Sequence, residues 1–193
     1  MMRIIRSTEH RRMPWKNGGG ETTEIAIAPE RATTGDFDWR LSMARVESGG
    51  PFSVFPGIDR TLAVLDGDGL HLTIEGMEPA ALTVRSEPLA FPGDAPTGAE
   101  LIGGAVTDLN IMTRRGKLAH SMSRLTVNGA IELPTDGVQV LLFCQSGTAR
   151  ILTGDETAEL GPLDTLHLDV SPAHLRVEAS DALLFLISLK RTA

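Results

Sequence analysis

The feature that most constrains the fold is a pair of short apolar runs on either side of the turn at residues 66–69, Asp-Gly-Asp-Gly. In both runs the apolar side chains occupy every second position: Leu62, Val64, Leu70, Leu72 and Ile74. A period of two is typical of a β-strand with one buried face. Aspartate and glycine tolerate the positive φ angles of a tight turn. The stretch therefore predicts a β-hairpin, entered through a loop that ends at Arg60 and places this arginine at the mouth of whatever the strands enclose.

Similar short runs recur along most of the chain and favour an all-β fold. They cover residues 24–28, 39–44, 81–85, 105–114, 177–179 and 182–189. The 20 glycines and 11 prolines of the 193-residue chain recur between the runs, whereas apolar patterns of helical period with capping residues are almost absent. We therefore predict a β-sandwich or β-barrel architecture.

The pattern restarts after Gly116, which indicates an internal repeat. Val140 and Leu142 resemble Leu62 and Val64, and the turn glycine Gly147 corresponds to Gly69. Two similar β-units of this kind predict one half at residues 1–115 and a second half at residues 116–193. We expect these two units to form one compact chain.

Composition and charge exclude several classes of function. With 41% hydrophobic and 22% charged residues, the chain is a globular protein and not a disordered one. A formal net charge of -7 argues against nucleic-acid binding, which requires a basic surface. No apolar run is long enough to span a bilayer and the N-terminus lacks the apolar segment of a signal peptide. We expect a cytoplasmic protein with no nucleic-acid or membrane partner.

The cysteine and histidine content gives no sign of a metal or cofactor. Cys144 is the only cysteine and lies in an apolar run, which predicts a buried, unreactive thiol and excludes an internal disulfide. A doubled β-barrel resembles the cupin superfamily, whose enzymes usually hold a metal through a His-x-His pair, a glutamate and a later histidine. No two histidines here are one residue apart; they are His10, His71, His120, His167 and His174. We therefore expect neither a metal nor another cofactor.

Two predicted strands carry polar residues on one face. In one strand Arg40 and Ser42 alternate with apolar residues; in the other Asp108, Asn110 and Arg114 do so. Such a face either lines a polar cavity or faces solvent, and the more common exposed arrangement is the interpretation favoured here.

The glycine-rich segment at residues 17–20 has two open interpretations. It is either a wide turn before the strand at residues 24–28 or a loop whose N–H groups approach a ligand. A phosphate-binding loop is excluded because no Gly-Lys-Ser/Thr sequence follows.

Several motifs, in order along the first 115 residues, resemble those of the HutD/Ves family. They are MPWKNGGG (13–20), WRLSMA (39–44), GPFSVFPGIDR (50–60), FPGD (91–94) and DLNIMTR (108–114). The resemblance implies a bicupin, with two cupin-like (RmlC-like) β-barrel or jelly-roll halves and without the usual metal ligands. HutD proteins accompany the genes of histidine catabolism and are thought to regulate that pathway by sensing an intermediate, with N-formylglutamate the favoured candidate. Ves relatives are linked to cold response.

The matched motifs also imply a set of ligand-binding residues for a small carboxylate. Arg60 is the first candidate for the carboxylate contact, because a guanidinium group grips a carboxylate through two parallel hydrogen bonds. We expect aromatic side chains to wall the pocket and Asp108 to orient an arginine. The full predicted set is Arg60, Arg40, Arg114, Asn17, Asn110, Thr22, Ser42, Ser53, Trp15, Phe52, Phe55 and Asp108.

Three hypotheses for function follow. We favour a non-enzymatic, metal-free bicupin that binds a small carboxylate and regulates histidine utilisation. The alternative is a metal-independent isomerase or hydrolase acting on a small acid or sugar, for which His71, His167 and Asp108 are the candidate bases. The third is an interaction module whose exposed strands pair with another subunit. A homodimer is compatible with each.

Overall fold

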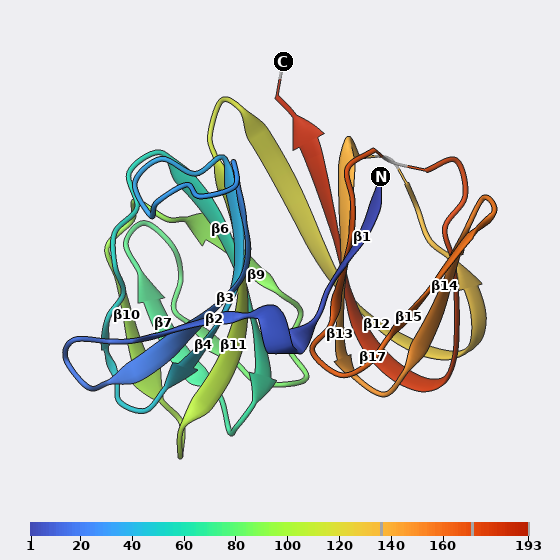
Figure 1. The fold of residues 1–193 in the computed structure, drawn as a ribbon. Coiled ribbons are helices and arrows are strands. Elements are labelled where there is room, and N and C mark those ends of the chain that lie inside the picture. The colour runs from blue at the N-terminus through green and yellow to red at the C-terminus, as the bar shows by residue number, and fades with distance from the viewer. Residues whose placement is uncertain (136, 171, 193) are drawn as a thin grey trace. The chain divides into compact units, whose positions relative to one another are not determined.

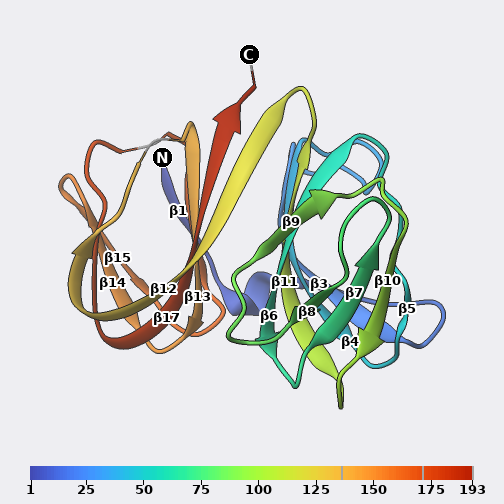
Figure 2. The ribbon, with the colours of Figure 1, turned by 180° about the vertical axis from the view of Figure 1, so that it is seen from behind.

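The computed structural model describes residues 1–135, 137–170 and 172–192, and their regular structure is almost entirely β (Figures 1 and 2). The described helix is the short 3-10 turn η1 (Ser7–Glu9). No helix among these residues has the length and hydrophobicity needed to cross a bilayer. The chain forms two compact units: residues 11–119 with residue 192, called the N-terminal unit, and residues 1–10 with 120–191, called the C-terminal unit. The predicted all-β class is confirmed.

The N-terminal unit consists of two sheets with an apolar core between them. The six-stranded sheet has the order β2 (Arg11–Pro14), β3 (Gly20–Ala28), β4 (Trp39–Val46), β11 (Val106–Arg114), β6 (Ile58–Asp66) and β9 (Leu89–Pro92). The four-stranded sheet, seen in Figure 2, has the order β5 (Gly50–Pro51), β10 (Thr97–Leu101), β7 (Leu70–Ile74) and β8 (Ala80–Leu82). Leu62 and Val64 of the first sheet join Leu70 and Leu72 of the second in one buried cluster. The alternation predicted for these strands is confirmed.

The predicted hairpin is wrong, because β6 and β7 lie in different sheets. β6 pairs with β11 and β9, whereas β7 pairs with β10 and β8. The turn between them takes the chain from one sheet to the other. Gly67 has φ +95° there, and a Cβ on it would lie 2.5 Å from the carbonyl oxygen of Ala105. The two alternating runs therefore bury their apolar faces against each other across the core and do not pair edge to edge.

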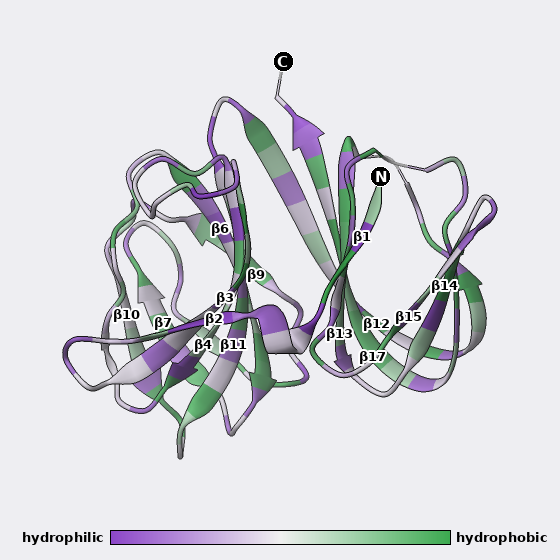
Figure 3. Cartoon of the chain, in the orientation of Figure 1, coloured by the Kyte–Doolittle hydropathy of each residue, from purple (hydrophilic) through white to green (hydrophobic). Residues whose placement is uncertain are grey.

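The C-terminal unit has one seven-stranded sheet and an interior filled by apolar side chains. Its strands are β1 (Met2–Ile5), β16 (Thr165–Leu168), β13 (Gln139–Ser146), β17 (Arg176–Arg191), β14 (Ala149–Thr153) and β15 (Glu156–Leu160), in this order, with β12 (Leu118–Glu132) paired to β17. Hydrophilic and hydrophobic residues alternate along β12 (Figure 3). The runs predicted as two last strands form the single strand β17. The buried interior residues include Val140, Leu142, Cys144, Leu184 and Leu186.

The boundary between the units differs from the predicted 1–115 and 116–193. β1, which is labelled in Figure 1, pairs with β16 of the C-terminal unit, with Met2 opposite Leu168. Arg6 Nη1 then lies 2.7 Å from Asp164 Oδ2, and the Ser7 N–H donates to Asp164 Oδ1 at 2.9 Å. The first ten residues therefore belong to the C-terminal unit. Local periodicity does not show which distant strands pair. The sequence pattern therefore did not predict that β1 pairs with β16.

Candidate functional site

A cavity of about 1040 Å³ lies in the N-terminal unit and is lined from β2, β3, β4, β5, β6 and β11 and from the loops before β3, β4 and β6. The structure brings all twelve predicted site residues to its wall: Trp15, Asn17, Thr22, Arg40, Ser42, Phe52, Ser53, Phe55, Arg60, Asp108, Asn110 and Arg114. That these residues contact a ligand stays a prediction. Lining residues that the sequence analysis did not include are Met13, Lys16, Thr34, Ile58 and Met112, among others.

Strand register explains why the polar residues converge. Asn110 of β11 lies opposite Ser42 of β4 on one side and Leu62 of β6 on the other. Directly opposite residues on paired strands point to the same face, so the polar residues share the inward face with the core residue Leu62. Asp108 is 1% exposed and Asn110 2%. The interpretation that placed this polar face in solvent is therefore wrong.

Arg60 is held in one orientation at the wall of the cavity. Its Nε donates to Asn110 Oδ1 at 2.7 Å, and Asn110 Nδ2 donates in turn to Asp108 Oδ1. The guanidinium carbon lies 4.5 Å from the ring centre of Phe52 and 5.4 Å from that of Phe91. Neither Nη atom has a hydrogen-bond partner within the part of the chain that the structure describes. The group is thus a positioned cation with two unused donor nitrogens.

Burial changes the pKa of both ends of this chain of hydrogen bonds. Burial lowers the pKa of Arg60 to about 10, an effect that the nearby Asp108 partly offsets and Arg40 reinforces. Arg60 therefore remains cationic at neutral pH. Burial raises the pKa of Asp108 to about 6, against the opposing effects of Arg60, of the hydrogen bond from Asn110 and of the backbone N–H of Ala44. The second oxygen of Asp108, Oδ2, is buried and has no hydrogen-bond partner among the described residues.

The other two predicted arginines are engaged by partners. Arg40 Nε donates to Glu24 Oε2 at 2.8 Å in a largely buried ion pair. Arg114 donates from Nε to the Phe37 carbonyl at 2.9 Å and from Nη2 to the Gly35 carbonyl at 3.2 Å, which ties it to the loop between β3 and β4. Of the three arginines, Arg60 is therefore the one whose positive charge is least balanced by neighbouring hydrogen-bond acceptors. Glu24, which the predicted site set did not include, lies outside the cavity lining and acts through its ion pair with Arg40.

The glycine-rich segment forms the turn between β2 and β3 and also carries residues to the cavity wall. Trp15 Nε1 donates to Thr22 Oγ1 at 2.8 Å across this turn. Asn17 Oδ1 accepts from the Gly19 N–H at 3.0 Å. A Cβ on Gly20 would lie 2.1 Å from the Arg45 carbonyl oxygen and 3.1 Å from the Trp15 ring, so only glycine fits. The turn interpretation is confirmed, and its ligand role stays a prediction.

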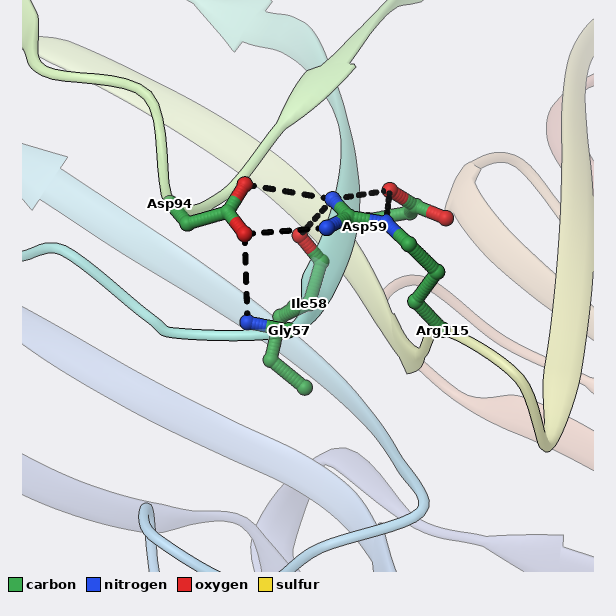
Figure 4. Close-up of polar contacts among 5 residues, drawn as sticks. All are labelled: Gly57, Ile58, Asp59, Asp94 and Arg115. Atoms are coloured by element: carbon green, nitrogen blue, oxygen red, sulfur yellow. Dashed lines mark hydrogen bonds and ion pairs between the residues drawn. The ribbon is translucent and has the colours of Figure 1, made fainter.

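Arg115, which the sequence analysis did not single out, fixes the loop before β6 (Figure 4). Its Nη2 lies 2.7 Å from Asp59 Oδ1 and its Nη1 lies 2.9 Å from Asp94 Oδ2. Asp94 Oδ2 also accepts from the Gly57 N–H at 3.2 Å. The hydrogen bonds from Arg115 and Gly57 lower the pKa of Asp94 to about 2. Two residues of the matched motifs, Asp59 and Asp94, thus hold the loop that carries Phe52 and lie outside the cavity lining.

Of the candidate bases, only Asp108 lines the cavity. His71 is exposed on β7, as its alternation predicted. His167 lies between Leu166 and Leu168, which point into the core of the C-terminal unit, and its Nε2 is 3.4 Å from Gln139 Oε1 on the other face. Cys144 is buried, as predicted, and burial raises the pKa of its thiol to about 11. Within residues 1–135, 137–170 and 172–192 no three His, Cys, Asp or Glu side chains cluster as metal ligands would.

Sequence comparisons identify relatives over nearly the whole chain. The HutD family model matches residues 7–185. A Pseudomonas putida protein described as an uncharacterised 21.2 kDa protein in the hutC 3' region is 34% identical over 178 residues, 92% of each chain. Protein Ves of Citrobacter koseri is 42% identical over 112 residues, which are 55% of this chain and 56% of Ves.

Solved structures also match the chain over nearly its whole length. PA5104 from Pseudomonas aeruginosa PAO1, a conserved protein of unknown function, matches with a TM-score of 0.92 and 32% identity over 98% of this chain and 99% of PA5104. HutD from Pseudomonas fluorescens SBW25, in a formate condition, matches with a TM-score of 0.82 and 31% identity over the whole of both chains. Bacillus subtilis oxalate decarboxylase at pH 4.6 shares 10% identity at a TM-score of 0.72 over 96% of this chain and 75% of its own, a likeness of fold alone that confirms the cupin-like architecture. The chain belongs to the HutD family, which is related to the histidine-utilisation gene region.

Proposed function

We propose that the protein binds a small carboxylate in the cavity of the N-terminal unit and thereby regulates histidine utilisation, with N-formylglutamate as the first candidate ligand. The observation that carries the proposal is the state of Arg60. This buried guanidinium is oriented by Asn110, lies between two aromatic rings and has no ion-pair partner within 4.0 Å in the described chain. A carboxylate that accepts from both Nη atoms would compensate its charge.

The relatives support the regulatory part of the proposal. One relative is described as a protein of a hutC 3' region, and a solved structure similar over the whole chain is named HutD. An apolar rim made by Trp15, Phe52 and Phe55 would exclude water from a bound carboxylate, and this strengthens its hydrogen bonds to Arg60.

The test is a thermal-shift and calorimetry panel of histidine-pathway metabolites against the wild type, Arg60→Ala and Arg85→Ala. Arg85 is exposed and outside the cavity lining, so its variant controls for the loss of one positive charge. A ligand at about a hundredfold over its dissociation constant adds about 2.7 kcal/mol to the free energy of unfolding. We expect N-formylglutamate to raise the melting temperatures of the wild type and of Arg85→Ala, and to leave the melting temperature of Arg60→Ala unchanged. If no carboxylate in the panel shifts the wild type, the proposal is wrong.

A second candidate function, a metal-independent enzyme, is favoured by Asp108. It lines the same cavity with a pKa of about 6, close to the range in which a carboxyl group exchanges protons at neutral pH. Proton NMR of the protein mixed with each ligand that binds distinguishes the two functions. New product resonances that disappear in Asp108→Asn favour the enzyme, and an unchanged ligand spectrum at saturation favours the binding protein.

A further inference from the structure

Asp108 has an unused hydrogen-bonding atom at the cavity wall. Its Oδ1 accepts from Asn110 Nδ2, whereas its Oδ2 is buried and has no partner among the described residues. A buried polar atom without a partner costs about 1–3 kcal/mol, so native proteins rarely leave one without a reason. Since Asp108 lines the same cavity as Arg60, the atom that completes its hydrogen bonding can come from a bound ligand.

The position of Asp108 relative to Arg60 is fixed by Asn110. The amide of Asn110 accepts from Arg60 through its oxygen and donates to Asp108 through its nitrogen. One short side chain therefore connects the donor nitrogens of Arg60 to the acceptor oxygen of Asp108. A ligand that spans both groups must carry a carboxylate and a hydrogen-bond donor only a few atoms apart.

We propose that Asp108 is a specificity-determining residue that accepts a hydrogen bond from an N–H or O–H group of the ligand, so that the cavity selects α-N-acyl amino acids or α-hydroxy acids over plain dicarboxylates. This inference rests on the proposed function, because it assumes that the ligand carboxylate binds Arg60. It assigns Asp108 a direct ligand contact in addition to the expected role of orienting an arginine through Asn110. A site that hydrogen-bonds a ligand N–H rejects analogues without it, because the acceptor is then left unpaired.

The ionisation of Asp108 decides which ligand group it recognises. As a carboxylate it accepts a hydrogen bond, and once protonated it donates one. The charged residues of the cavity wall and its inward strands are Arg60 on β6, Arg40 on β4 with Glu24 on β3, Arg114 on β11 and Lys16 in the loop before β3. Burial moves the pKa of Asp108 to about 6, so the titration of this residue is the one that the selectivity is expected to follow.

The experiment compares two ligand pairs that differ in the donor. The pairs are N-formyl-L-glutamate with N-formyl-N-methyl-L-glutamate, and 2-hydroxyglutarate with glutarate. At about pH 7.5 we expect the wild type to bind the donor-bearing member of each pair about tenfold more tightly or better, as is typical of a hydrogen bond to a charged group. Below about pH 6 this ratio should fall, because Asp108 then carries a proton.

The variant Asp108→Asn tests the assignment to this residue. Its amide can keep the bond from Asn110 Nδ2 and present N–H to the cavity, so the preference should be lost while Arg60 still binds carboxylates. Asp155→Asn, an exposed carboxylate of the C-terminal unit, is the matched control and should keep the wild-type ratio. If Asp108→Asn does not fold, the pH dependence of the wild-type ratio decides.

The outcomes separate this inference from the proposed function. Saturable binding with equal affinity within both pairs overturns the role of Asp108 and leaves the proposed function intact. A preference that persists in Asp108→Asn overturns it equally. If the wild type binds none of the four compounds or other carboxylates of the metabolite panel, the proposed function is wrong and this inference falls with it.

Discussion

Strands β6 and β11 of the N-terminal unit have counterparts in β13 and β17 of the C-terminal unit. In each unit the first strand pairs antiparallel with the second and ends in a turn glycine of positive φ. A Cβ on Gly67 would lie 2.5 Å from the Ala105 carbonyl, and a Cβ on Gly147 would lie 2.2 Å from the Asp181 carbonyl. The predicted repeat is therefore present, with Gly67 in place of Gly69 as the counterpart of Gly147.

Aligned on these glycines, the two units fill corresponding inward positions with opposite chemistry. Arg60 of β6 corresponds to Val140 of β13. Across the strand pair, Asp108 corresponds to Leu184 and Asn110 to Leu186. The C-terminal residues lie in one apolar cluster, whereas their N-terminal counterparts line the cavity. The same strand frame thus accommodates either filling, and three polar residues distinguish a cavity wall from a packed core.

The largest expected effect comes from placing a carboxylate in the apolar core of the C-terminal unit. Leu184 is fully buried in the C-terminal core, so Leu184→Asp would bury a carboxylate with no partner. We expect a loss of about 4 kcal/mol or more in the free energy of unfolding, measured by urea denaturation. Leu184→Met, which keeps the volume, should cost less than about 1.5 kcal/mol and is the control. A small cost for the aspartate variant would show that the unit already holds water or space there.

The reverse exchange tests whether the polar residues of the N-terminal unit act together. Asn110→Leu alone leaves both Arg60 Nε and Asp108 Oδ1 without their partner and should cost about 1–3 kcal/mol. The triple variant Arg60→Val, Asp108→Leu, Asn110→Leu copies the C-terminal unit and removes all the unpaired groups at once. We expect it to be more stable than the single variant and to bind no carboxylate. Costs that simply add up would contradict the coupling of the three residues.

The same residues show how much of the fold and of the candidate site the local sequence pattern predicts. The period of two at residues 62–74 predicted the strands correctly, because it records which side chains are buried. It could not predict that β6 and β7 pair with other strands, because pairing depends on segments far away in the chain. The polar face of β11 was assigned to solvent for a related reason: alternation separates two faces and does not say which is covered. The site residues came from the family motifs, and those motifs contain both cavity residues such as Arg60 and loop-fixing residues such as Asp94.

A third, intermediate effect concerns the pH dependence of stability. The pKa of Asp108 is about 6 in the folded protein and 3.8 is its ordinary value, so the folded state binds more protons between these values. Stability should therefore fall as pH rises through this range, by up to about 2–3 kcal/mol for this residue. Urea denaturation at several pH values should show a difference between Asp108→Asn and wild type that shifts in favour of the variant from about pH 4 to about pH 7. A parallel pH profile for the two proteins would mean that Asp108 ionises normally.

The smallest expected effect comes from the pair of positions at which the two units already agree. Cys144 corresponds to Val64, and both side chains are buried and apolar. Cys144→Val should therefore change the free energy of unfolding by less than about 1.5 kcal/mol, because a buried free cysteine packs as a small apolar residue and valine adds only one methyl group. The wild-type thiol should also resist a thiol reagent until the protein unfolds, since burial raises its pKa to about 11. Fast labelling of the native protein would show that the C-terminal interior opens, and it would weaken the contrast between a packed unit and a hollow one.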